Sequence, residues 1–426
     1  MSALQLESKE QLSSRLVELE GIYEQYKQQG LKLDMSRGKP GPEQLDLTMG
    51  LLDCVNSREG YRTKDGLDTR NYGLLDGIPE MKEIFASVFE VDQSQVIVGG
   101  NSSLNMMFDF ISTVYSRGIL GNTPWCELKG VKFLCPAPGY DRHFAITEYF
   151  GIEMITIDMT PAGPDMEQVE KYVSHPLVKG IWCVPMYSNP DGITYSDETV
   201  KRLASLKTGA PDFYIMWDNA YCLHHLEFPG DKLLNLYNEA KAAGNENRVV
   251  MFASTSKISF PGAGVAAMAA SPAVIADVKR RMSFQTIGHD KINMLRHARF
   301  FGSYENMCEH MKLHAAVLRP KFKVVLDTLE KNLGGKGVAQ WNSPRGGYFV
   351  SVNLLDGCAK ETIRLLKEAG VVMTPAGATY PYGKDPRDRN IRIAPTFPPI
   401  EELQVAMELF CICAEIACIR KLLGNA

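Results

Sequence analysis

The segment RVVMFASTSKISFPGAG, residues 248–264, places a single lysine directly after an apolar run. Residues 248–254 have the pattern of a buried β-strand, and the side chains around Lys257 are small, hydroxylic or apolar. Burying an unpaired ammonium group is costly, so a lysine at the end of a buried strand is expected to be paired, neutral or covalently bound. The segment therefore predicts both a buried sheet and a lysine with a chemical role.

Six further apolar runs share this strand pattern, and helical segments lie between them. Nearly continuous apolar runs are typical of strands buried on both faces of a mostly parallel sheet, and their alternation with helices indicates repeated strand–helix units. We therefore expect an α/β fold whose large domain contains a mostly parallel seven-stranded sheet. Its strands are predicted at 95–100, 132–136, 153–159, 180–185, 213–218, 248–254 and 264–271.

The pattern changes after about residue 300, where long helices and three shorter strand-like runs follow. We assign this part to a smaller α+β domain, which the N-terminal helix is expected to join. The predicted divisions are an N-terminal helix and segment at 1–50, a large domain at 51–310 and a small C-terminal domain at 311–426.

Composition excludes several classes of partner and location. The formal net charge is -4 without long charged runs, so we expect neither nucleic acid nor a membrane surface as a partner. No apolar stretch reaches the roughly 18 residues of a spanning helix, and the N-terminus lacks a signal-peptide layout. The ten cysteines are scattered through apolar runs, as reduced core thiols are. These features predict a cytoplasmic protein.

Polar side chains follow the carboxyl ends of several predicted strands. Ligands of open α/β sheets bind at this edge, so these side chains are expected to lie close together. After 95–100, Asn101, Ser102 and Ser103 open a helix whose backbone N–H groups form an anion site. The groups that follow later strands are Tyr140, Asn189, Asp218, Tyr221, Ser254, Ser256 and Lys257.

This collection matches the needs of a phosphorylated aromatic aldehyde. A lysine can form a Schiff base with the aldehyde, and a carboxylate can keep a pyridine nitrogen protonated so that the ring accepts electrons. The phenol and the amide can hydrogen-bond a ring hydroxyl, and a second aromatic side chain can stack on the ring. His224 and His225 are adjacent and would point in different directions on a helix, and the segment HDKINMLRH (289–297) lacks a carboxylate or cysteine partner at metal-ligand spacing. We therefore interpret these histidines as structural and expect no metal site.

At this point the sequence resembles the fold-type I pyridoxal-phosphate enzymes, and specifically the class I aminotransferases. The motifs that carry the resemblance occur in the order of that family and span about residue 36 to residue 397. The segments SRGKPGPEQLDL and TSKISFPGAG are most similar to an unusual subgroup of aspartate aminotransferases. The sequences are also similar to the aminotransferase half of certain regulators. The other motifs are NYGLLDGIPEMKEIF, GGNSSLN, CPAPGY, YSNPDG, WDNAY, STSK, RGGYF and NIRIAPT.

The resemblance implies a role for each matching residue around pyridoxal 5'-phosphate. Lys257 would bind the cofactor covalently and carry the substrate proton, while Asp218 would pair with the pyridine nitrogen. Tyr221 and Asn189 would flank the ring hydroxyl, and Tyr140 would stack on the ring. The phosphate would be held by the hydroxyl groups of Ser102, Ser103, Ser254 and Ser256.

Three further residues match positions that bind the substrate or act between subunits. Arg392 would clamp the α-carboxylate of the substrate through two parallel hydrogen bonds. The backbone of Gly38 would border that carboxylate. Tyr72 matches a tyrosine that reaches the phosphate in the neighbouring subunit, which implies a homodimer with shared sites.

One position departs from the family pattern. The family has an arginine about eight residues after the lysine, whereas this chain has Gly264 and Val265 there and no basic residue from 258 to 278. Helix N–H groups and serine hydroxyls can carry part of the phosphate charge. We therefore expect the phosphate to be held differently, less tightly, or with a cation from elsewhere.

The predicted activity is the transfer of an amino group from an L-amino acid, with aspartate favoured, to 2-oxoglutarate by a ping-pong mechanism. A dicarboxylic substrate needs a second cation, for which Arg37, Arg142 and Arg345 are candidates. The alternatives left open are a transaminase for aromatic or long-chain amino acids, a pyridoxal-phosphate-dependent β-lyase and a non-catalytic sensor that binds the cofactor, since a fold does not determine a reaction.

Overall fold

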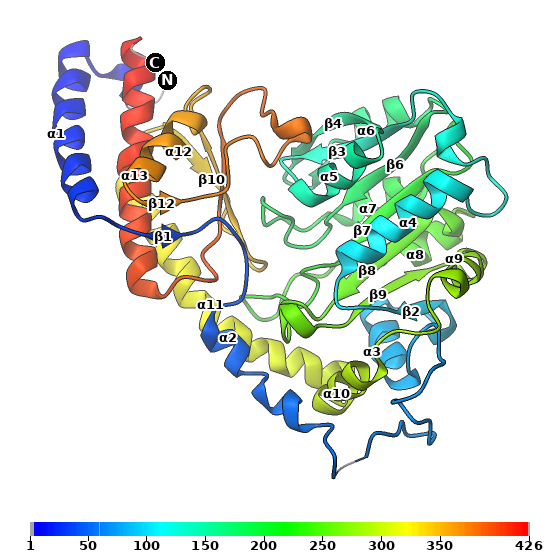
Figure 1. Cartoon of the computed structure of the whole chain (residues 1–426). Coiled ribbons are helices and arrows are strands. Elements are labelled where there is room, and N and C mark those ends of the chain that lie inside the picture. The colour runs from blue at the N-terminus through cyan, green and yellow to red at the C-terminus, as the bar shows by residue number, and fades with distance from the viewer. Residues whose placement is uncertain (1–3, 59, 425–426) are drawn as a thin grey trace.

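The computed structural model describes residues 4–58 and 60–424. Its larger part is built on a sheet that has eight strands within the described residues, in the order β2-β9-β8-β7-β6-β3-β4-β5 (Figure 1). The five strands from β8 to β4 pair in parallel, and β9 is antiparallel to both neighbours. The bounds are β2 (Val96–Val98), β3 (Lys132–Ala137), β4 (Glu153–Thr160), β5 (Gly163–Pro164), β6 (Val178–Cys183), β7 (Tyr214–Asp218), β8 (Val249–Ser254) and β9 (Ala266–Ala270).

All seven predicted strands are present, and the mostly parallel sheet is confirmed. The eighth strand, β5, is a two-residue segment that pairs antiparallel with the end of β4 at the edge of the sheet. Its Gly-Pro sequence carries no apolar run, so the sequence pattern gave no sign of it.

Helices cover both faces of the large sheet because alternate strand residues point to opposite sides. Tyr214 and Met216 of β7 pack under one set of helices, and Ile215 and Trp217 under the other. The first set is α4 (Ser103–Arg117), α5 (Asp141–Tyr149) and α9 (Pro272–Gln285). The second is α3 (Pro79–Phe89), α6 (Met166–Val173), α7 (Asp197–Ala204), α8 (Leu236–Ala242) and α10 (Lys291–Phe301).

The smaller part contains an antiparallel sheet in the order β10-β11-β13, three-stranded in the described chain. A separate parallel pair joins β1 near the N-terminus to β12. The elements are β1 (Leu33–Asp34), β10 (Ala339–Trp341), β11 (Val350–Leu354), α12 (Ala359–Glu368), β12 (Val371–Val372), β13 (Asn390–Ile393) and α13 (Ile400–Leu423).

The long helix α11 (Tyr304–Leu333) belongs to both parts. Met307 and Met311 lie in the apolar core of the large sheet, whereas Leu318 and Phe322 lie in the core around α13. The chain therefore passes from one core to the other inside a continuous helix. The divisions at residues 50 and 310 stay a prediction.

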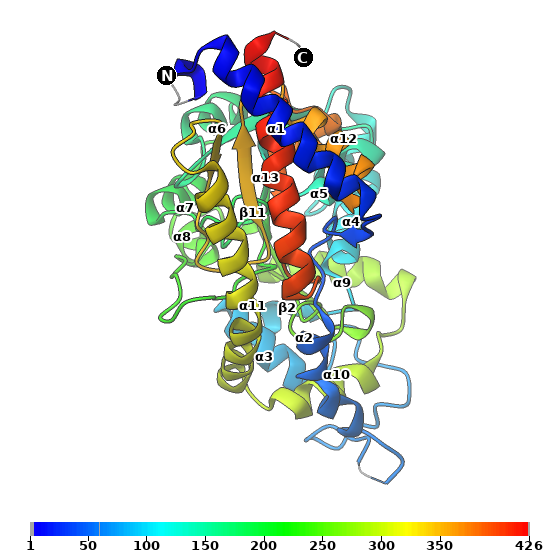
Figure 2. The same ribbon diagram turned by 90° about the vertical axis from the view of Figure 1, so that its left-hand side faces the viewer.

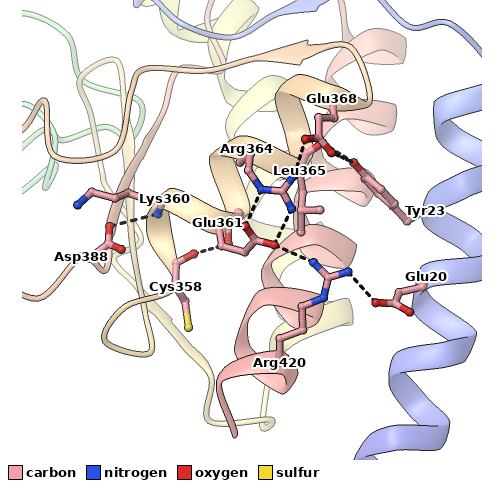
Figure 3. A network of polar contacts seen from close by, with 11 residues as sticks. Glu20, Tyr23, Cys358, Lys360, Glu361, Arg364, Leu365, Glu368, Asp388 and Arg420 are labelled. Carbon is pink, nitrogen blue, oxygen red and sulfur yellow. Dashed lines mark hydrogen bonds and ion pairs between the residues drawn. The ribbon is translucent and has the colours of Figure 1, made fainter. Parts of the chain in front are cut away.

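The N-terminal helix α1 (Lys9–Gln28) packs across α13, at the end of the molecule farthest from the large sheet (Figure 2). Buried Leu12, Leu19 and Tyr23 form its inner face. Figure 3 shows the polar contacts beside this packing: Arg420 of α13 bonds Glu20 of α1 and Glu361 of α12, both at 2.7 Å. These contacts attach the start of the chain to its C-terminal part.

The remaining helical segments are short. They are α2 (Pro42–Asp46) and the 3₁₀ turns Leu4–Leu6, Met49–Asp53, Gln93–Gln95, Trp125–Glu127, Glu246–Arg248, Pro261–Ala263 and Pro381–Gly383. Within residues 4–58 and 60–424, every helix is too short or too polar to cross a lipid bilayer. The same part of the chain contains no group of three histidine, cysteine or acidic side chains arranged to hold a metal ion.

Candidate active site

A cavity of about 160 Å³ lies where the carboxyl ends of β6, β7 and β8 meet the N-terminus of α4. The parallel strands end at one edge of the sheet, so the loops that follow them converge there. Four apolar residues, Leu104, Met107, Val184 and Ala220, complete its wall. The structure brings together nine predicted residues around it: Ser102, Ser103, Tyr140, Asn189, Asp218, Tyr221, Ser254, Ser256 and Lys257.

Lys257 is half-buried in the turn after β8. Its Nζ lies 4.8 Å from the ring centroid of Tyr221 and 5.7 Å from that of Tyr348. No described carboxylate forms an ion pair with it. Aromatic faces attract a cation without binding its protons as a carboxylate does. The amine is thus held in place and remains available for chemistry inside the cavity.

Asp218, at the end of β7, has one satisfied oxygen and one unsatisfied oxygen. Its Oδ2 lies 3.1 Å from Nε2 of buried His143. Its Oδ1 is buried and has no hydrogen-bond partner among the described residues. A buried acceptor without a partner costs about 1–3 kcal/mol. A protonated ring nitrogen placed in the cavity would satisfy this oxygen.

The sequence reasoning missed His143. This residue lies one helical turn after Tyr140, on α5, and its ring stacks on Trp182 with centroids 4.4 Å apart. That stacking fixes the imidazole against Asp218. The signal available in the sequence was the spacing of three residues from Tyr140, which brings both side chains to the same end of the helix.

The two phenols at the cavity stay protonated at neutral pH. Burial raises the pKa of Tyr140 to about 12. Burial, with a smaller contribution from the Asp218 charge, raises the pKa of Tyr221 above its usual range. Tyr221 also stacks on Tyr348, with ring centroids 5.9 Å apart. Both hydroxyl groups are therefore hydrogen-bond donors, as a ring oxygen in the cavity would require.

The opposite end of the cavity is suited to an anion. Ser102 is the N-cap residue of α4 but its side chain makes no capping bond, so the backbone N–H groups of the first turn point to the cavity end. The hydroxyl of Ser256 donates to the carbonyl of Asn101 at 3.1 Å. The Ser254 hydroxyl donates to that of Ser256, also at 3.1 Å.

The two residues at the position of the family arginine are Gly264 and Val265, of which Val265 is a buried apolar residue. A Cβ atom on Gly264 would lie 3.2 Å from the backbone nitrogen of Ser256 and 3.2 Å from the Phe260 carbonyl oxygen. Such contacts are tighter than ordinary packing. Among the residues that line the cavity, Lys257 is the sole lysine or arginine. Besides Lys257, the donors that the cavity lining offers to an anion are therefore helix N–H groups and serine hydroxyls.

Arg392, on β13, reaches the rim of the same site. One guanidinium nitrogen, Nη1, donates to Asn189 Oδ1 at 3.2 Å and to Asp141 Oδ1 at 3.1 Å. The other, Nη2, donates to Thr374 Oγ1 at 3.2 Å. The Phe349 ring lies below the guanidinium, 4.9 Å from its central carbon. Of these partners, the sequence reasoning identified Asn189 alone.

Gly38 lies against the ring that supports this arginine. A Cβ at residue 38 would lie 2.5 Å from Cζ of Phe349, which requires a glycine unless the ring moves. The Gly38 loop and the Arg392 guanidinium therefore both contact the Phe349 ring. That the Gly38 backbone borders a bound carboxylate stays a prediction.

Tyr72 does not lie at this cavity. Its side chain is exposed (81%), and it lines a separate surface hollow with Arg70, His289 and Lys291. Any contact of Tyr72 with a Lys257 cavity must therefore involve a second copy of the chain.

The candidates for a second cation differ in their surroundings. Arg345 is 2.9 Å from Glu227 and 2.9 Å from Asp231, so its charge is already neutralised. Arg37 and Arg142 are exposed and form no ion pair within the described residues. Arg345 is thus the least suitable of the three.

A chain of buried hydrogen bonds links Lys257 to two helices. The amide of Gln44, on α2, lies 3.1 Å from Nδ1 of His314 and donates to the Tyr348 hydroxyl at 2.9 Å. That hydroxyl in turn donates to the Lys257 carbonyl at 3.4 Å. Nε2 of His314 lies 3.1 Å from Nε2 of His310. The backbone of the reactive lysine is therefore fixed from behind by α2 and α11.

The adjacent His224 and His225 lie among aromatic side chains, away from any described group of metal ligands. His224 is buried between Tyr221 and Tyr348, and burial lowers its pKa well below the usual range. His225 lies 2.7 Å from the Tyr187 hydroxyl through Nδ1. Cys411 and Cys413 are likewise buried in α13.

Comparison with known proteins decides the family. Residues 7–426 match the profile of the family described as aspartate amino-transferase. The chain belongs to this family. An aspartate aminotransferase of Corynebacterium glutamicum is 46% identical over 401 residues, which cover 93% of this chain and 91% of that protein. The chain is therefore an enzyme of the aminotransferase class, as the motifs predicted.

Solved structures of this family confirm the fold. An aspartate transaminase of Corynebacterium glutamicum superposes with a TM-score of 0.96 at 43% identity, covering 99% of each chain. An α-aminoadipate aminotransferase of Thermus thermophilus, solved with N-(5'-phosphopyridoxyl)-L-leucine, gives a TM-score of 0.74 at 19% identity and covers 93% of this chain and 94% of that one. The second likeness shows the fold alone, which is that of the fold-type I aminotransferases.

Proposed function

We propose that this aminotransferase binds pyridoxal 5'-phosphate at Lys257 and transfers the amino group of L-aspartate to 2-oxoglutarate by a ping-pong mechanism. The observation that carries the proposal is the position of Lys257 in one cavity with the unsatisfied Oδ1 of Asp218, with Arg392 at the rim. The relative at 46% identity, named an aspartate aminotransferase, supports the choice of substrate.

The residues present fit this cofactor at each of its groups. Asp218 Oδ1 offers the acceptor that a protonated pyridine nitrogen needs. The N-terminus of α4 with Ser254 and Ser256 offers donors for the phosphate, and Tyr221 with Asn189 offers polar groups for the ring hydroxyl. When bound, the cofactor supplies a Schiff base and an aromatic ring that accepts the electrons of a broken Cα–H bond.

Lys257 moves the proton. Its Nζ lies over the Tyr221 ring in the cavity, where it would take the proton from the Cα of a substrate that Arg392 orients. Tyr221 remains protonated beside it and so does not compete as a base. The contact between Asp218 Oδ2 and His143 fixes the carboxyl group and leaves Oδ1 for the ring nitrogen.

Arg392 orients the substrate. A guanidinium binds a carboxylate through two parallel hydrogen bonds, which fixes both the position and the rotation of the bound acid. Phe349 and Thr374 hold the guanidinium plane, and the Gly38 loop passes over the same ring. Fixing the α-carboxylate in this way limits the orientations that the rest of the substrate can take beside the cavity that holds Lys257.

We further propose that the enzyme is a homodimer with shared sites. The support for this is that Tyr72 is exposed, lies outside the Lys257 cavity of its own chain, and lines a surface hollow with the basic side chains of His289 and Lys291. In the dimer, Tyr72 of one copy would donate a hydrogen bond to the phosphate in the other. A monodisperse monomer at micromolar concentration that still turned over aspartate would contradict this.

Steady-state assays with a panel of amino donors test the reaction. With 2-oxoglutarate as acceptor, we expect aspartate to give the highest kcat/KM, above glutamate analogues and phenylalanine. The Lys257→Ala variant should be inactive, and Lys323→Ala, which changes an exposed lysine on α11, should match the wild type.

Other outcomes of the assay separate the alternatives. Faster turnover of phenylalanine would indicate an aromatic aminotransferase. Release of a keto acid from cystathionine without an acceptor would indicate a β-lyase. Binding of the cofactor with no turnover of any donor would indicate a sensor and contradict the proposed function.

A further inference from the structure

Arg392 has few hydrogen-bond donors left for a substrate. Its guanidinium carries five N–H bonds. Asp141 and Asn189 take two on Nη1, and Thr374 takes one on Nη2. The N–H of Nε has no partner among the described residues. Asn189, which lines the cavity, accepts from Nη1, so the edge of the guanidinium that faces the cavity is the one that carries Nη1 and Nη2. One further N–H on Nη2 remains.

Two parallel bonds to a carboxylate therefore require that one existing partner leaves. Asn189 and Thr374 are both buried and uncharged. Asp141 is the most exposed of the three partners: 35% of its side chain is accessible, whereas Asn189 is 3% exposed and Thr374 is 7% exposed. It is also the one partner that carries the same group as the substrate, a carboxylate. Asp141 is thus the partner that a carboxylate ligand replaces at least cost.

We propose that Asp141 holds the place on Arg392 that the α-carboxylate of the substrate takes, and that substrate binding displaces it. Asp141 then acts as an internal competitor that lowers the apparent affinity for amino and oxo acids. This inference rests on the proposed function, because it assigns the substrate carboxylate to Arg392. Asn189, Thr374 and Phe349 keep the guanidinium in place when Asp141 leaves.

The displaced carboxylate has a second stable place. Asp141 is the first residue of α5, where a negative charge is stabilised by the helix dipole whether or not it contacts Arg392. Displacement therefore exchanges one favourable interaction for another and does not leave a buried, unpaired charge. Because α5 covers the large sheet and β13 belongs to the small one, the same pair also joins the two parts of the molecule.

Binding of succinate to the Asp141→Asn variant tests this inference. Succinate has two carboxylates and no amino group, so it binds without turnover. We would measure succinate binding by calorimetry, with and without added pyridoxal phosphate. Asp141→Asn should bind succinate roughly five-fold more tightly than the wild type. Removing a partly exposed ion pair raises the fraction of molecules whose Arg392 can bind a carboxylate by about that factor. The KM for aspartate should fall by a similar factor, with kcat changed less.

Two control variants isolate the contact with Arg392. Glu148→Gln removes a negative charge from an exposed position on the same helix and should leave succinate binding unchanged. In an Arg392→Lys background, Asp141→Asn should no longer improve succinate binding, because lysine lacks the paired guanidinium N–H groups to which Asp141 binds. An improvement of equal size in that background would overturn the inference and indicate a general charge effect.

The outcomes separate this inference from the proposed function. Weaker or unchanged succinate binding in Asp141→Asn, in an enzyme that transaminates aspartate, would overturn the inference alone and make Asp141 a residue that positions Arg392. Tighter succinate binding in a protein without aminotransferase activity would support the inference and contradict the proposed function. A wild-type protein that does not bind succinate, either with or without pyridoxal phosphate, would contradict both the inference and the proposed function.

Discussion

At the scale of single residues, the site depends on pairs in which one side chain fixes the state of another. Asp218 is effective because His143 occupies one of its oxygens and leaves the other unsatisfied inside the cavity. Lys257 is available because aromatic rings hold it in place of a carboxylate. In the proposed reaction, both arrangements would orient a reacting group before the substrate arrives, which is how enzymes limit reorganisation during a reaction.

The Asp218→Asn variant tests the first pair. The amide keeps the shape and a contact with His143 but removes the charge that holds a ring nitrogen protonated. We expect kcat for aspartate to fall by roughly 100-fold or more, as when one oriented electrostatic contact is lost. His143→Asn, measured beside it, should lose less, since Asp218 keeps its charge. Equal activity of Asp218→Asn and the wild type would contradict the role of the carboxylate.

At the scale of elements, α2 and α11 support the lysine turn from behind. Gln44 is fully buried, and its amide is bonded to both His314 and Tyr348. The set is consistent if Gln44 donates to both, Tyr348 donates to the Lys257 carbonyl, and His314 donates through Nε2 to Nε2 of His310. The Ile258 carbonyl, 3.3 Å from His310 Nε2, then accepts from the Thr48 hydroxyl. Each buried polar atom then has a partner, which gives the turn a single arrangement.

Substituting Gln44 tests this support. In Gln44→Leu, the Tyr348 hydroxyl and His314 Nδ1 lose a buried partner, so the free energy of unfolding should fall by about 1–3 kcal/mol. Urea unfolding followed by circular dichroism measures the change. Gln340→Leu, the same substitution at an exposed site on β10, should leave stability within experimental error. A neutral Gln44→Leu variant would show that the chain of bonds contributes nothing.

Stability should also depend on pH through His314. Burial, and then the nearby His310, lower its pKa from 6.5 to about 4 in the folded protein. Between these values the unfolded chain binds more protons than the folded one, so stability is complete above pH 6.5 and falls as the pH drops toward 4. At pH 5.5 this one site should cost about 1 kcal/mol relative to pH 7.5.

The pH dependence is checked by urea unfolding at pH 7.5 and 5.5. The wild type should unfold at lower urea at pH 5.5, with His297 contributing in the same direction because burial lowers its pKa to about 4 as well. His314→Gln should show a smaller difference between the two pH values. A wild-type midpoint that is constant over this range would contradict the assignment of a neutral His314.

At the scale of the whole molecule, the features that could be predicted from the sequence are those that a short continuous segment determines. The seven main strands are near-continuous apolar runs, and nine cavity residues follow strand ends in familiar motifs. The two-residue strands β1 and β5 carry no such pattern. His143 and Asp141 were missed as partners because their contacts join positions 75 and 251 residues apart, with Asp218 and Arg392 respectively. Such pairs depend on tertiary structure.

Subunit mixing tests the assignment of Tyr72 across a dimer. A hybrid of Lys257→Ala and Tyr72→Ala chains has one site with both native residues if Tyr72 acts on the partner's cofactor. Random exchange should then restore about a quarter of the wild-type sites, because half of the dimers are hybrids with one native site each. No recovery above the sum of the two parent variants would show that Tyr72 does not act between subunits.

The most direct test of the central claim is the absorbance of the purified protein with pyridoxal phosphate, followed by borohydride reduction and mass mapping. We predict a band of lysine-bound cofactor whose label maps to Lys257 and is absent from Lys257→Ala. Titration with aspartate should convert this band to the pyridoxamine form, and 2-oxoglutarate should restore it. A label on another lysine, no band in the wild type, or a band that aspartate leaves unchanged would contradict the account.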